Sequence, residues 1–195
     1  MRTAVLLAAL AALAAAVGGS VWRVQAAAGD QPGDAPKSTF SVAEAQSFSR
    51  FPLYDAGPLA LGLRRVAVLR RDDGPADYVS FVYGDCAAQD GTGCAPPAEI
   101  QVWPACVRNL SLYREPDTPS GEQAAVRGVP AAFFEEGRRL ELQTGRATVV
   151  VFARSRGDAL ELAGLLRGVN VTVGPGQRLP RPTEGSVAGR LECGG

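Results

Sequence analysis

Residues 126–153 read VRGVPAAFFEEGRRLELQTGRATVVVFA, and the pattern of this stretch decides the fold. Three runs rich in residues that favour strands occupy 126–134, 138–144 and 147–153. The runs are separated by Glu135-Glu136-Gly137 and by Gly145-Arg146, which are typical of short turns. The stretch therefore predicts two successive hairpins in an antiparallel meander, with Pro130 at an edge or a bulge.

A helix is predicted directly after the meander. Ser155 and Asp158 have the spacing of an N-terminal capping box. The following residues form one apolar stripe at helical spacing: Ala159, Leu162, Ala163 and Leu166. Gly168 provides a C-terminal stop, and the stripe packs most simply on one face of the meander.

The upstream half of the domain adds strands and a second helix. Ser41 and Glu44 form another capping-box pattern, which predicts a short helix over 42–48. Strands are predicted over 63–70, 78–83 and 99–103. The predicted class is α+β, an antiparallel meander sheet of five to seven strands with one short N-terminal helix and one C-terminal amphipathic helix packed on one face.

An apolar N-terminal segment indicates export. Arg2 precedes a small and aliphatic run over 3–17, which is typical of a secretory signal peptide, with cleavage near Ala26 or Ala28. The alternative is a signal anchor, because residues 3–22 carry no charge and are just long enough to span a bilayer. We expect an extracytoplasmic protein, either secreted or anchored to the outer face of the cell membrane by residues 3–22.

Composition divides the chain into four predicted parts. Residues 1–23 are the signal peptide or signal anchor, and 24–38 are a flexible linker punctuated by Pro and Gly. Residues 39–173 are the exported α+β domain. Residues 174–195 are rich in Pro and Gly and are predicted to be a disordered tail.

The overall composition argues against several classes of function. The chain has no His, so it cannot build a Ser-His-Asp or Cys-His system or a histidine-ligated metal site. Its 20 basic and 20 acidic residues balance, which argues against a nucleic-acid partner. We therefore expect a protein that is not an enzyme and that needs no cofactor and no metal.

The four Cys are predicted to form disulfides, the default state in an oxidising compartment. Cys86 and Cys94 flank a short polar loop, and the Cys86–Cys94 pairing is favoured. Cys94–Cys106 and Cys86–Cys106 are the alternatives, and Cys193 is available to pair with the remaining thiol.

Adjacent aromatic residues hint at a second apolar surface. Phe133 and Phe134 follow one another on a predicted strand, so their rings point to opposite faces of the sheet. One ring must then face away from the helix layer. Together with Trp103, these two residues are the candidates for a groove or partner surface.

Two sets of motifs carry a resemblance, which covers roughly residues 79–170. The motifs Tyr83-Gly-Asp-Cys86, Gly93-Cys-Ala-Pro-Pro97 and Ile100-Gln-Val-Trp103-Pro104-Ala-Cys106 resemble a family of uncharacterised exported proteins of high-GC bacteria. The second half is similar to a widespread uncharacterised extracytoplasmic α+β domain, through Arg127-Gly-Val129-Pro-Ala131, Leu140-Glu-Leu142, Gly145, 149–152 and a closing helix over 159–166. That domain also forms the outer part of some membrane-tethered regulators of stress transcription.

These observations favour an exported, non-enzymatic binding or interaction domain. Its expected partner is a protein or a small apolar ligand, with membrane contact through the N-terminal segment if that segment is not cleaved. One alternative is an accessory or sensor subunit of a membrane-bound complex. The other is a hydrolase that uses Asp or Glu.

Overall fold

The computed structural model describes residues 38–72, 77–85, 95–110 and 121–193. Its strands are β1 (Ser38–Thr39), β2 (Tyr54–Asp55), β3 (Leu59–Ala60), β4 (Leu63–Arg71), β5 (Tyr78–Tyr83), β6 (Ala98–Pro104), β7 (Glu122–Val126), β8 (Val129–Phe134), β9 (Arg139–Thr144), β10 (Ala147–Phe152) and β11 (Arg167–Gly168). Its helices are α1 (Val42–Ser47), the 3-10 turn η3 (Glu135–Gly137) and α2 (Arg156–Leu165).

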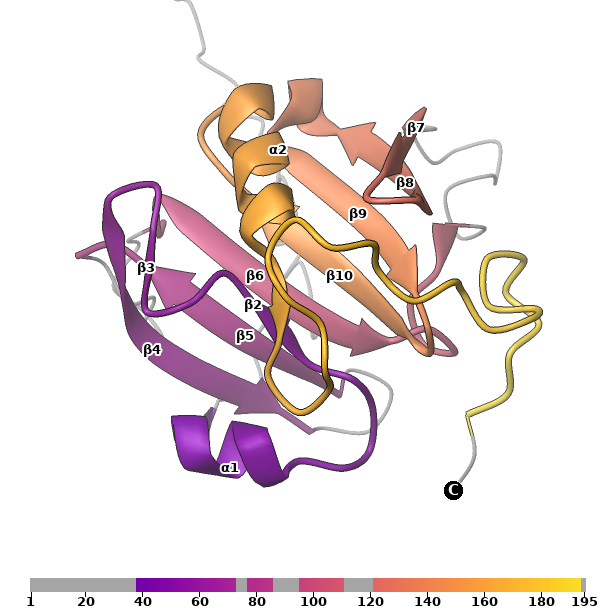
Figure 1. Cartoon of the computed structure of the whole chain (residues 1–195), viewed down its shortest axis with the longest axis horizontal. Helices are drawn as coiled ribbons and strands as arrows, with labels where there is room; N and C mark the ends of the chain where they lie inside the picture. The colour runs from indigo at the N-terminus through magenta and orange to yellow at the C-terminus, as the bar shows by residue number, and fades with distance from the viewer. Residues whose placement is uncertain (1–37, 73–76, 86–94, 111–120, 194–195) are drawn as a thin grey trace, which may run out of the picture. The chain divides into compact units, whose positions relative to one another are not determined.

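One antiparallel sheet dominates this α+β domain (Figure 1). It has nine strands in the order β1-β4-β5-β6-β10-β9-β8-β7, with β3 paired to β4 off this path. A separate two-stranded sheet joins β11 to β2. The sheet is larger than the predicted five to seven strands, because β1 and β3 have only two residues each, too few to show an alternating pattern. β1 also begins at Ser38, inside the predicted linker.

The meander forms with one difference from the predicted boundaries. The run predicted over 126–134 is divided by a turn into the end of β7 and the whole of β8. Arg127 has φ 51° and Gly128 has φ 81°, the pair of positive angles that a two-residue hairpin turn requires. Pro130 lies in an inner strand rather than at an edge. It is tolerated there because the pairing of β8 with β9 starts one residue later, at Ala131.

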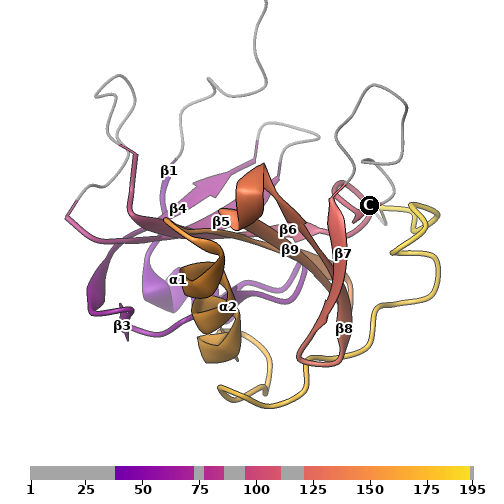
Figure 2. The ribbon, with the colours of Figure 1, turned by 90° about the horizontal axis from the view of Figure 1, so that it is seen from above.

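Both helices lie on the same side of the sheet (Figure 2). α1 begins with the predicted capping box: the Glu44 amide donates to Ser41 Oγ at 3.1 Å, and the Ser41 amide donates to Glu44 Oε2 at 2.7 Å. At α2, the Asp158 amide donates to Ser155 Oγ at 3.1 Å. The helix stops before the predicted Gly168, because Arg167 and Gly168 continue as β11 and pair with β2.

The core fills the space between the helices and the facing side of the sheet. Alternate residues of β5, β6, β8, β9 and β10 point into this core. They are Val79, Phe81, Ile100, Val102, Ala131, Phe133, Leu140, Leu142, Val149 and Val151. The predicted stripe of α2 meets them, since Ala159, Leu162, Ala163 and Leu166 are all fully buried. Each fully buried Leu or Ile contributes about 1.5–3 kcal/mol to the free energy of unfolding. The apolar patterns therefore predict this core correctly.

The C-terminal segment, predicted to be a disordered tail over 174–195, packs against the domain as far as Cys193. Leu179 is buried, and its amide donates to the Arg127 carbonyl at 3.1 Å. Thr144 Oγ1 donates to the Pro180 carbonyl at 2.9 Å, and the Thr183 amide donates to the Gly145 carbonyl at 2.8 Å. The residues that make these contacts follow no helical or strand spacing. The sequence of the segment therefore has no apolar period from which the packing could be predicted.

Within the ranges described above, no helix is long and apolar enough to cross a membrane. The predicted signal peptide or anchor, residues 1–23, lies outside those ranges. The polar loop between Cys86 and Cys94 also lies outside them.

Candidate functional site

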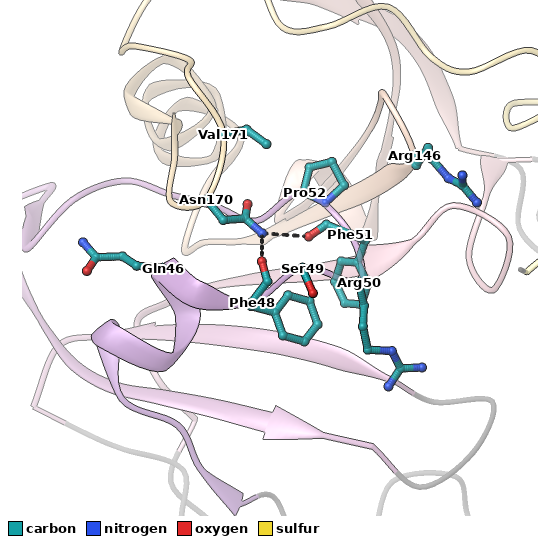
Figure 3. Close-up of a pocket in the computed structure, with 9 residues that line it drawn as sticks. All are labelled: Gln46, Phe48, Ser49, Arg50, Phe51, Pro52, Arg146, Asn170 and Val171. Atoms are coloured by element: carbon teal, nitrogen blue, oxygen red, sulfur yellow. Dashed lines mark hydrogen bonds between the residues drawn. The ribbon is translucent and has the colours of Figure 1, made fainter. Parts of the chain in front are cut away.

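An open groove of about 600 Å³ lies where three distant segments of the chain meet (Figure 3). The connection from α1 to β2 supplies Gln46, Phe48, Ser49, Arg50, Phe51 and Pro52; the β9–β10 turn supplies Arg146; and the loop after β11 supplies Asn170 and Val171. Its lining thus combines aromatic and aliphatic side chains with amide, hydroxyl and guanidinium groups. This combination is typical of binding sites for small molecules.

The side chain of Asn170 fixes one wall of the groove. Its Oδ1 accepts from the Leu53 amide at 2.7 Å, and its Nδ2 donates to the carbonyls of Phe48 at 2.6 Å and Phe51 at 3.0 Å (Figure 3). Both the oxygen and the nitrogen of this side-chain amide are therefore used to hold the connection from α1 to β2. Asn170 is a structural clamp that gives the groove a defined shape before any ligand binds.

Aromatic side chains stiffen the same connection. The rings of Phe48 and Phe51 lie 4.8 Å apart at 80°, and the rings of Phe40 and Phe48 lie 6.0 Å apart at 85°. Edge-to-face pairs of this kind stabilise their rings by about 0.5–1.5 kcal/mol beyond the burial of area. Phe51 is buried, whereas Phe48 is only partly buried and offers apolar surface to the groove.

Several polar groups of the lining are not used by the fold. Gln46, Ser49 and Arg146 are exposed, and their side chains make no hydrogen bond or ion pair to any other residue that the structure describes. Arg50 pairs with Asp77 at 2.9 Å but keeps 60% of its side chain exposed. The lining holds two guanidinium groups and no carboxylate. The lining of the groove therefore carries positive charge and donor groups that are available to a ligand.

Asp77 lies behind Arg50 and orients it. The Asp77 side chain is only 4% exposed, and its second oxygen lies 3.6 Å from Nε of Arg70. Burial raises the pKa of the Asp77 carboxyl, while the guanidinium groups of Arg50 and Arg70 act in the opposite direction. Asp77 is close to Arg50 but does not line the groove.

A buried cluster around Asp55 is the strongest competing candidate, because it unites ionisable groups from distant segments. Asp55 pairs with Arg65 and, at 3.2 Å, with Arg167 Nε, and it accepts from the Gly57 amide at 3.0 Å. Asp55 is 2% exposed. Because its polar atoms are used within the fold, the cluster anchors β2 against the sheet.

Tyr83 completes this cluster as a neutral group. Its hydroxyl accepts a hydrogen bond from the Ala56 amide at 2.9 Å. Burial, together with the negative charge of Asp55, raises the pKa of Tyr83 well above its usual range. Tyr83 therefore stays protonated at neutral pH and is not suited to act as a general base there.

The structure does not bring together the three aromatic residues predicted to form a groove. Phe133 faces the helix layer, where the Arg156 guanidinium lies 3.9 Å from the centre of its ring. Phe134 points to the opposite face and packs with Leu110 and Ala132. The alternation of the two rings is as predicted, but both rings are buried.

Trp103 is on the same face of the sheet as Phe134 but lies on β6. Two strands, β10 and β9, separate β6 from β8, the strand of Phe134. Its ring stacks on Tyr78 with centroids 4.1 Å apart, and its Nε1 donates to Gln101 at 3.1 Å. Trp103 therefore belongs to a packed polar-aromatic cluster on the side of the sheet opposite the helices. The groove that the structure does show was missed because it has no local sequence motif.

One disulfide is present in the described range, between Cys106 and Cys193, with Cα atoms 5.2 Å apart. It corrects the alternatives Cys94–Cys106 and Cys86–Cys106, because Cys106 is already paired. Cys86 and Cys94 lie outside the described residues. A disulfide is consistent with an oxidising, extracytoplasmic compartment.

Among the described residues, no group of three or more His, Cys, Asp or Glu side chains is placed to hold a metal ion. Comparison with family models, with curated proteins and with solved structures finds no match to this chain. The geometry of the groove is therefore the observation that bears on function.

Proposed function

We propose that the chain is an exported, non-enzymatic binding domain and that the groove between the α1–β2 connection, the β9–β10 turn and the loop after β11 holds its ligand. The observation that carries this proposal is that some polar groups near the groove are hydrogen-bonded within the fold, whereas others in its lining have no described partner. The buried Asp55 and the partly buried Asn170 have their partners inside the fold, whereas the side chains of Gln46, Ser49 and Arg146 have no partner among the described residues. Exposed donors beside partly buried rings suit ligand binding. The lining offers no Asp, Glu, Tyr, Cys or Lys as a general acid or base.

The apolar N-terminal segment favours a second reading, in which this binding domain is an accessory or sensor subunit of a membrane-bound complex. Residues 3–22 carry no charge and are long enough to act as an anchor. In that case the occupied groove would be recognised by a membrane partner.

Native mass spectrometry of the full chain, recovered from the cell envelope in which it is made, tests the proposal. We expect the mature protein to carry a small-molecule adduct, which Arg146→Glu abolishes because it reverses a charge in the groove. Arg154→Glu is the matched control, since Arg154 is exposed and lies outside the groove. An adduct retained equally by both variants, or none in the unaltered protein, would contradict the proposal. The same spectra show whether the N-terminal segment is retained.

A further inference from the structure

We infer that the ligand of this groove is an amphiphile whose negatively charged group binds the guanidinium group of Arg146, with Arg50 adding positive charge from a second segment, and whose apolar body packs on Phe48 and its neighbours. This inference rests on the proposed function and adds the chemical class of the ligand.

The charge of the lining is not a consequence of overall composition. The chain has a formal net charge of zero, yet the groove is lined by two Arg and by no Asp or Glu. Arg50 and Arg146 come from different segments, and their guanidinium groups lie apart from one another and point in different directions (Figure 3). A guanidinium presents its donors as a planar fork that matches carboxylate, sulfonate or phosphate oxygens.

Arg146 is presented by a rigid turn. Its own carbonyl accepts from the Ala105 amide at 2.8 Å. The neighbouring Gly145 accepts from the Thr183 amide at 2.8 Å and donates to the Pro180 carbonyl at 3.3 Å. The backbone of the turn is therefore tied to two other segments, while the side chain of Arg146 has no described partner. Because the backbone is already fixed, binding an anion needs to order only the Arg146 side chain.

The two arginines are not equivalent. Asp77 pairs with Arg50 at 2.9 Å and offsets part of its charge, whereas no carboxylate among the described residues pairs with Arg146. A bound anion must compete with Asp77 for Arg50 but not for Arg146. Removing the charge of Arg146 should therefore weaken the binding of an anion more than removing the charge of Arg50.

The apolar part of the lining lies beside the charges. It consists of Phe48, Phe51, Pro52 and Val171, of which Phe51 is buried and the others are partly exposed. The hydrogen bonds from Asn170 to the carbonyls of Phe48 and Phe51 hold this surface in place. An inorganic anion would leave it uncovered, so the lining fits a ligand with an apolar body as well as a charge.

Two fluorescent probes with the same ring system test the inference on the full chain. 1-Anilinonaphthalene-8-sulfonate carries an anionic group, whereas N-phenyl-1-naphthylamine lacks it. We expect the sulfonate to bind about tenfold more tightly, because charge-assisted hydrogen bonds to Arg add to the burial of the rings. Arg146→Gln should weaken the sulfonate about tenfold and Arg50→Gln about threefold, with the neutral probe unchanged. Arg154→Gln is the control and should change neither affinity.

Equal affinity for the two probes, unchanged in Arg146→Gln, would overturn the inference but leave a groove that binds neutral ligands. Failure of both probes to bind would contradict the proposed function as well. Vesicles distinguish the two sources of such an anion. Sedimentation with phosphatidylglycerol vesicles but not with phosphatidylcholine vesicles, lost in Arg146→Gln, identifies a lipid headgroup. If the protein does not sediment with either kind of vesicle but binds the sulfonate tightly, the ligand is a free amphiphile.

Discussion

Replacing both Cys106 and Cys193 with Ala is expected to lower the free energy of unfolding by about 4 kcal/mol. The bond joins residues 87 positions apart, so its loss restores a large amount of chain entropy to the unfolded state. The C-terminal segment should also loosen near Cys193, because the described contacts that remain, such as the hydrogen bond from Thr183 to Gly145, lie further back along the chain. Urea unfolding followed by circular dichroism measures the change in stability.

The control for this prediction is Cys86→Ala with Cys94→Ala, which leaves the bond between Cys106 and Cys193 intact. Unfolding of that variant measures the contribution of the predicted Cys86–Cys94 bond, so that the effects of removing the two cysteine pairs can be compared. A decrease below about 1 kcal/mol in Cys106→Ala/Cys193→Ala would contradict the structural role assigned here. Peptide mapping without reduction that joins Cys106 to Cys86 or Cys94 would contradict the pairing itself.

Arg127→Asn should lower the free energy of unfolding by about 3 kcal/mol. The Arg127 guanidinium donates to four carbonyls: Gln177 at 2.6 Å, Gly174 at 2.8 Å, Ala163 at 3.2 Å and Leu166. Two of these carbonyls lie at the end of α2, and the other two lie in the C-terminal segment. The side chain therefore caps the helix and ties the tail to the β7–β8 turn, and its loss leaves partly buried carbonyls without partners.

Asn is chosen because it tolerates the positive φ of 51° at this position better than most residues do. The variant therefore removes the guanidinium while largely preserving the turn. Arg154→Asn is the control, since Arg154 is exposed and has no described ion pair. Thermal unfolding that gives the same midpoint for the Arg127→Asn variant and the original protein would show that these four hydrogen bonds do not contribute to stability.

Regular elements of this fold could be predicted from the sequence, because they carry apolar periods or caps. β5 was predicted with its observed ends, and the capping box at Ser41 forms as expected. The hairpin between β7 and β8 was missed because a positive φ at an Arg cannot be inferred from its side chain. The ordered tail was missed because its partners, such as Cys106, are distant in the sequence and its hydrogen bonds are made by the backbone.

The candidate site could not be predicted for a related reason. Its lining comes from 46–52, from Arg146 and from 170–171, and none of these segments has a recognisable binding motif. The aromatic pair Phe133-Phe134 drew attention instead, but both rings are used for packing. One signal was present, since Gly145-Arg146 places a cationic side chain at a predicted turn. Only the folded chain shows that Asn170 holds the segment that contains Phe48 and Phe51 in place at the groove.

The central claim is that ligands bind in the groove rather than on the opposite face of the sheet. Amide chemical shifts of the ¹⁵N-labelled full chain, recorded during titration with 1-anilinonaphthalene-8-sulfonate, test this claim most directly. We expect the largest shifts at 46–53, at Gly145 and Arg146, and at 170–171, and we expect Arg146→Gln to weaken them. Shifts confined to the neighbours of Trp103 and Phe134, with 46–53 and 170–171 unchanged, would contradict it.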